Sequence, residues 1–163
     1  MNSVSEPVAG IEVALAHAKR LLEKKPELAV EQAREILSVY PGLPQARLIL
    51  GAAHRRAGRA LAALEVLEPL AVEQPIAAPV HLELGVARGE AGRVSEAIAA
   101  FRRAVELQPG SADGWRLLAD HLDAQSDTEG ADAARARWKE AKAAGTEVTY
   151  WQADEKGRWQ RHA

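Results

Sequence analysis

The stretch from Val80 to Pro109, VHLELGVARGEAGRVSEAIAAFRRAVELQP, decides the fold of this chain. We interpret it as a helical hairpin that turns at Gly92. Gly85 in the first helix and Ala97 in the second are small enough to let the two helices approach closely, and Phe101 fills the space between them. The closing proline ends the second helix, because its ring cannot continue the helical hydrogen-bond ladder.

The same unit recurs along the chain with a period of 34 residues. The proline that closes each unit stands at Pro41, Pro75 and Pro109. One position of the repeat holds Ala29, Ala63, Ala97 and Ala131. The small-residue position holds His17, Gly51, Gly85 and Ala119, and the histidine is its misfit. Four copies in phase are a much stronger signal than one copy alone.

The spacing L-G, then A-x3-F, then P, repeated in phase, resembles that of tetratricopeptide repeat (TPR) proteins from about residue 10 to 144. The resemblance implies an all-α fold, a right-handed TPR α-solenoid of four helical hairpins. The repeats would cover about 10–43, 44–77, 78–111 and 112–145. We expect helices at 11–24, 28–39, 45–57, 60–72, 79–91, 94–107, 112–124 and 128–144. A flexible arm at 1–9 and a C-terminal β-hairpin cap at 146–163 complete the prediction.

Composition narrows the class of protein. The chain has 163 residues, 47% of them hydrophobic but only 4% aromatic, which favours closely packed helices over an aromatic-filled β core. The net charge of −2 creates no general attraction for nucleic acid or membranes. The chain has no Cys, its start lacks the basic region of a signal peptide, and no apolar run reaches the roughly 20 residues of a membrane span. We therefore expect a soluble, cytoplasmic protein.

The sequence offers no catalytic, cofactor or metal site that we would expect to function. It has no Gly-rich phosphate loop and no HExxH motif, and its five histidines do not form a ligand spacing on one helix. Asp120, His121 and Asp123 could be read as a base with orienting carboxylates. Neighbouring residues on a helix point in different directions, so a solvated helix face is the preferred interpretation. We predict that the protein is not an enzyme and needs no cofactor.

The TPR resemblance implies that the first helix of each repeat lines a concave groove. Carried over by position, the partner-binding residues would be Leu48, Ala52, Arg55, Arg56, Leu82, Val86, Arg116 and Asp120. They would form an apolar floor, with the two neighbouring arginines near one end and carboxylates near the other. The Lys and Asn of the carboxylate clamp of chaperone-binding TPR families are absent. Gly89 would face this groove, whereas Gly85 would lie at the contact between helices.

The tail departs from the repeat and carries a second resemblance. Two β-prone runs, 147–152 and 158–161, predict a hairpin with Trp151 facing Trp159, packed on the last helices near Trp138. Residues 133–163 resemble the C-terminus of bacterial DNA polymerase III chi subunits, through Arg137-Trp138-Lys139, Thr149-Tyr150-Trp151-Gln152 and Gly157-Arg158-Trp159. That resemblance implies a site for an acidic partner tail, formed here by Arg135, Trp138 and Lys139. The chain before residue 146 does not read as the α/β fold of that family.

Three hypotheses for function follow. The first is a non-catalytic adaptor or scaffold that binds a protein, as a peptide or helix, in the groove. The alternative is a replication accessory related to the chi subunit, acting through its tail; interleaved acidic residues argue against direct nucleic-acid binding. A third is a purely structural scaffold or a chimeric sequence. The partner and the oligomeric state do not follow from the sequence.

Overall fold

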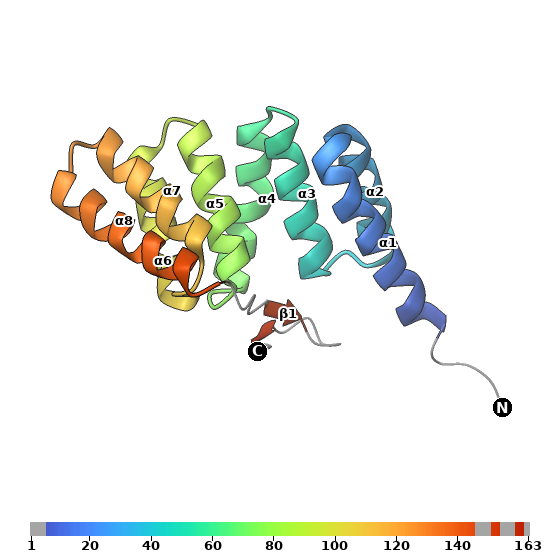
Figure 1. The fold of residues 1–163 in the computed structure, drawn as a ribbon. Helices are drawn as coiled ribbons and strands as arrows, with labels where there is room; N and C mark the ends of the chain where they lie inside the picture. The colour runs from blue at the N-terminus through green and yellow to red at the C-terminus, as the bar shows by residue number, and fades with distance from the viewer. Residues whose placement is uncertain (1–5, 146–150, 154–158, 162–163) are drawn as a thin grey trace.

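The computed structural model describes residues 6–145, 151–153 and 159–161, and these ranges hold eight α-helices and two short strands. The helices form hairpins that follow one another in chain order, from α1 and α2 at one end to α7 and α8 at the other (Figure 1). Each packs mainly on the helices before and after it, and α1, α3, α5 and α7 also contact one another in turn. The helices are α1 (Glu6–Lys24), α2 (Pro26–Val39), α3 (Pro44–Arg56), α4 (Ala60–Glu73), α5 (Ala78–Glu90), α6 (Val94–Leu107), α7 (Ala112–Ala124) and α8 (Thr128–Ala143).

The ends of the helices follow from local chemistry. Proline stands in the first turn of α2, α3 and α5, where its missing N–H costs nothing. The side chains of Ser111 and Asp127 cap α7 and α8 by accepting hydrogen bonds from the backbone N–H groups of Gly114 and Gly130. Gly92 turns the central hairpin with φ of +76°, a conformation that glycine adopts without strain. From α2 onward, the predicted helix boundaries are therefore close to the observed ones.

The first helix begins earlier than the sequence predicted. We expected a flexible arm at 1–9, but α1 starts at Glu6, so 6–9 are helical. Pro7 in the first turn is compatible with a helix start, because its ring fixes a helical φ. Residues 1–5 lie outside the described part of the chain.

The contact between the two helices of each hairpin follows the 34-residue pattern. Alanine is fully buried at all four copies of its position, Ala29, Ala63, Ala97 and Ala131. A β-carbon added at Gly85 would lie 2.6 Å from a ring carbon of Phe101, and one added at Gly51 would lie 2.6 Å from Leu67. The first repeat reverses the sizes. His17 occupies the glycine position there, and the fully buried Ala33 occupies the position of the phenylalanine.

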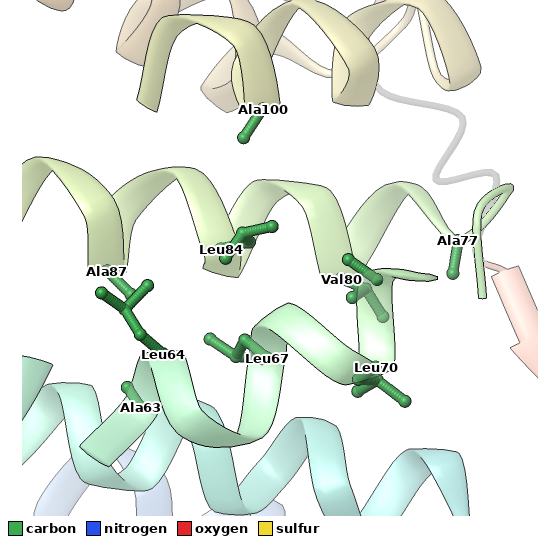
Figure 2. Close-up of a cluster of buried hydrophobic side chains, with 10 residues drawn as sticks. Ala63, Leu64, Leu67, Leu70, Ala77, Val80, Leu84, Ala87 and Ala100 are labelled. Carbon is green, nitrogen blue, oxygen red and sulfur yellow. The ribbon is translucent and has the colours of Figure 1, made fainter. Parts of the chain in front are cut away.

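The core is a chain of apolar clusters between neighbouring helices. In the central cluster, Leu64, Leu67 and Leu70 of α4 face Val80, Leu84 and Ala87 of α5, and Ala100 of α6 closes the far side (Figure 2). A second cluster joins α6, α7 and α8 around Phe101, Leu118 and Leu122. Because each cluster joins adjacent helices, each helix is stabilised mainly by its contacts with its immediate neighbours.

The tail contains two strands, β1 (Trp151–Ala153) and β2 (Trp159–Arg161), which pair antiparallel. Their register places Trp151 opposite Arg161 and Trp159 opposite Ala153. The predicted direct pairing of Trp151 with Trp159 is therefore wrong, because the two strands pair in a different register. The rest of the predicted cap, 146–150, 154–158 and 162–163, lies outside the described residues, and its packing on α8 stays a prediction.

Two histidines inside the helical row make stability depend on pH. Only 7% of His54 is exposed, and its Nδ1 accepts a hydrogen bond of 3.2 Å from Nε of Arg59. Burial lowers the pKa of His54, and the positive charge of Arg59 lowers it further. Burial also lowers the pKa of His81, whose Nε2 lies 3.1 Å from the carbonyl oxygen of Pro75.

We expect the free energy of unfolding to fall as the pH drops below about 6.5, the pKa of histidine in an unfolded chain. Below that pH the unfolded chain takes up protons that the folded histidines resist, whereas above it both states are neutral and the effect is absent. A histidine that stayed entirely unprotonated in the folded state would contribute at most about 1.4 kcal/mol per pH unit. Urea titrations at about pH 7.5 and 5.5 measure the difference. It should shrink in His54→Gln and persist in His17→Gln, which changes an exposed histidine; equal pH dependence in both variants would contradict the assignment.

Candidate functional site

The predicted groove residues lie on helices that are neighbours in space. Leu48 and Ala52 belong to α3, Leu82 and Val86 to α5, and the remaining residues to α3 and α7. The apolar members are largely used in packing. Ala52 is buried, Leu48 packs on the central core cluster, and both α5 residues pack on the cluster around Phe101. Their partly exposed edges form a shallow surface instead of an open apolar floor.

Arg55 joins α3 to α5 and is not free to bind a partner. Its Nε lies 2.9 Å from a carboxylate oxygen of Glu83, and its Nη1 lies 3.1 Å from one of Glu90. Only 15% of the arginine side chain is exposed. Burial tends to lower the pKa of Arg55, but the two carboxylates outweigh it and raise the pKa above its usual value. The sequence interpretation missed this ion pair, because it treated the two neighbouring arginines alike.

Arg56, unlike Arg55, is an exposed cation at the end of α3. Its guanidinium donates a 3.3 Å hydrogen bond to the carbonyl oxygen of Leu22, and no carboxylate among the described residues pairs with it. It borders a hollow of about 660 Å³ where the C-terminal ends of α1, α3 and α5 meet. The lining residues are Leu22, Glu23, Pro26, Arg55, Arg56, Gly58, Ala60 and Glu90.

The acidic end that we predicted is largely neutralised. Arg116 lies 3.7 Å from Asp113 and 3.2 Å from Asp120, both on its own helix α7. Asp123 pairs with Arg135 of α8. These are exposed pairs of the kind that contribute little to stability. The predicted groove residues therefore lack the strong charge gradient that the sequence suggested.

Gly89 does not face open space, contrary to the prediction. An added β-carbon there would lie 2.5 Å from Nε2 of His121 on α7. That imidazole is held by a 2.8 Å contact between its Nδ1 and the carbonyl oxygen of Leu117, and its ring lies 4.8 Å from that of Phe101. Because α7 packs against α5, a glycine on this face meets the next repeat.

The candidate acid–base group around His121 is not assembled. His121 packs into the helix contact, while its neighbours Asp120 and Asp123 pair with different arginines. No cluster of three or more His, Asp or Glu side chains able to hold a metal occurs in the part of the chain that the structure describes. Among those residues, no helix is long and apolar enough to cross a membrane.

The alternative tail site is only partly brought together. Arg135 is engaged by Asp123 and by Asp132, the latter at 2.6 Å. Trp138 is half-buried and lies under Nζ of Lys142, 5.5 Å from its ring centre. Lys139 is exposed one residue further along α8. Of these three residues, only Lys139 is therefore both charged and without an ion pair in the described part of the chain.

Residues 78–121 match the family model described as the tetratricopeptide repeat. This chain contains a TPR. The match covers α5, α6 and most of α7, the part of the fold built around Gly85 and Phe101. It confirms the repeat predicted from the stretch that closes at Pro109.

Solved structures of MamA share the arrangement of helices. MamA 41-end from Desulfovibrio magneticus RS-1 is 21% identical, with a TM-score of 0.73 over 84% of this chain and 78% of that one. A crystal structure of MamA is 18% identical, with a TM-score of 0.72 over 82% and 79%. MamA AMB-1 is 24% identical, with a TM-score of 0.65 over 85% and 75%. At these identities the likeness shows the fold alone. No curated protein matches the chain.

Proposed function

We propose that this protein is a non-catalytic TPR interaction module whose concave face, lined by α1, α3, α5 and α7, binds a segment of a partner protein. The observation that carries the proposal is the hollow of about 660 Å³ beside Arg56 in a row of TPR-like hairpins. TPR folds typically serve protein interaction, and the described acid–base groups are mostly paired within the fold.

The residues of the proposed site have different roles. Arg56 offers an exposed guanidinium, which favours a carboxylate of the partner near the ends of α1 and α3. Leu48, Leu82 and Val86 offer apolar edges to a side chain that lies across the helices. Arg55 holds α5 in place, and Ala52 permits close approach. Arg116 and Asp120 would contact the other end of the partner.

Reversing the charge of Arg56 should weaken binding. In Arg56→Glu we expect roughly tenfold slower association at low salt, because exposed charges at an interface act mainly on the association rate. Arg34→Glu is the matched control, since this arginine is equally exposed but lies on α2, outside the concave row. Partners captured by the wild-type protein would be identified by mass spectrometry and then titrated against both variants.

Unchanged association in Arg56→Glu would contradict the proposed site. A chain ending at Gly145 separates the groove from the tail, because it keeps all eight described helices. Binding that disappears with that truncation and survives in Arg56→Glu would move the site to the tail. The comparisons with known proteins give no support to the chi-like alternative, and we do not propose it.

A further inference from the structure

A second candidate binding site lies beside α8, the helix at the opposite end of the fold from α1 (Figure 1). A crevice of about 310 Å³ opens between α6, α7 and α8, on the side of the second helices of the hairpins. Its wall is mainly apolar and its edge carries arginines. The lining residues are Arg102, Val105, Glu106, Trp115, Leu118, Leu122, Gly130, Ala133, Ala134 and Arg137.

The preceding repeat junction, between α4, α5 and α6, holds an ion network at this place. There, Glu68 of α4 lies 3.4 Å from Arg88 of α5 and 3.3 Å from Arg93. Arg88 also lies 3.7 Å from Glu96 of α6. These long side chains fill the space between the second helices of neighbouring repeats and neutralise one another.

The same positions 34 residues later hold different chemistry. Arg102 occupies the repeat position of Glu68. Leu122 occupies that of Arg88, and Gly130 occupies that of Glu96. The ion network is thus replaced by an apolar wall and a space. Arg102 is exposed and has no carboxylate within ion-pair distance among the described residues.

The other long polar side chain at this junction, that of Arg137, does not cross the crevice as its counterpart does in the preceding junction. In the preceding junction, Arg103 crosses to donate a 3.3 Å hydrogen bond to the carbonyl oxygen of Pro75. Its counterpart Arg137 lies 3.1 Å from Glu140 on its own helix instead. The carbonyl oxygen of Pro109 accepts a 2.8 Å hydrogen bond from the indole N–H of Trp115, which occupies the repeat position of His81. This bond fixes the indole ring, which lines the crevice.

The nearby carboxylates already have partners. Glu106 lies 3.4 Å from Arg103, and Asp127 accepts the 2.9 Å capping hydrogen bond from the backbone N–H of Gly130. Arg102 also borders the adjoining hollow of about 540 Å³, so its guanidinium stands between two open spaces. Among the charged residues that line the crevice, Arg102 is thus the one without an ion-pair partner in the described part of the chain.

We propose that this crevice binds a short acidic segment of a partner protein, with one leucine or phenylalanine side chain in the crevice and a carboxylate on Arg102. The apolar wall accounts for the anchor, and the free guanidinium accounts for the carboxylate. A nucleic-acid backbone fits less well, because its phosphates make no use of the apolar wall. This site is independent of the proposed groove.

The test uses the full chain and three labelled probes. These are the amidated peptide Asp-Glu-Leu-Phe-Asp-Glu, its counterpart with lysines in place of the acidic residues, and a single-stranded oligo-dT. Fluorescence anisotropy should show binding of the acidic peptide alone. Arg102→Glu should weaken it at least about tenfold. Arg34→Glu changes the same repeat position on α2 and should leave it unchanged, as should Arg56→Glu.

A second pair of variants tests the crevice by its shape. Ala133 and Ala136 are both exposed on α8, but only the first lines the crevice. Ala133→Phe should fill the space and reduce binding at least about tenfold, whereas Ala136→Phe should not. No binding of the acidic peptide at about 1 mM would overturn the proposal. So would equal binding by the paired variants, preference for the lysine peptide, or binding of oligo-dT that depends on Arg102.

Discussion

Phe101→Ala is expected to lower the free energy of unfolding by about 3–5 kcal/mol. The ring is fully buried, and it fills the space between the two helices of the central hairpin, against Gly85 on one side and His121 on the other. Removing it leaves a cavity at the point where the third hairpin meets the fourth. Urea denaturation followed by circular dichroism measures the loss as a lower midpoint.

Two further alanine variants, one at a buried and one at an exposed position, serve as comparisons for Phe101→Ala. Leu67 occupies the same repeat position 34 residues earlier and is also fully buried, so Leu67→Ala should cost about 2–5 kcal/mol. Val72 of the same helix is 81% exposed, and Val72→Ala should stay within about 0.5 kcal/mol of the wild type. If Phe101→Ala also stayed within that margin, the ring would not be the filler that the repeat pattern assigns to it.

The repeat pattern allowed the fold to be predicted from the sequence. Close packing at Ala97 and Gly85 admits only small residues, so small residues recur in the sequence at the repeat spacing. Proline and glycine then mark where helices begin and turn. The hairpins, their register and most helix boundaries therefore followed from the residues, and the helical row with its TPR confirms them at that level.

The candidate site was less predictable, because it depends on how long side chains reach across repeats. Arg55 and Arg56 are neighbours of the same type, yet the first is bound by two glutamates of α5 and the second is not. Glu83 and Glu90 lie 28 and 35 positions from Arg55, close to one repeat length. A search for opposite charges near that spacing could have found this pair. The apolar crevice at α8 appears only when successive junctions are compared.

Gly85→Leu is expected to destabilise the protein more than Gly89→Leu, although neither glycine faces open space. Leucine gains roughly 0.8–1 kcal/mol over glycine in helix propensity at both positions, so that gain cancels in the comparison. At Gly85 the new side chain meets the ring of Phe101 between two tightly packed helices, where overpacking costs about 3 kcal/mol or more. At Gly89 it meets the end of the His121 side chain, which can rotate away.

Gly89→Leu should destabilise the protein less, because the side chain of His121 can move aside. Rotation forfeits the contact of its Nδ1 with Leu117 and its ring contact with Phe101, and we expect a net loss of about 1–2 kcal/mol for Gly89→Leu. Gly42→Leu is the control, because an added β-carbon there meets nothing within 4 Å. Thermal and urea unfolding of the three variants should rank them with Gly85→Leu least stable and Gly42→Leu near the wild type. A larger loss at Gly89 than at Gly85 would mean that the contact between repeats is more rigid than the contact within a hairpin.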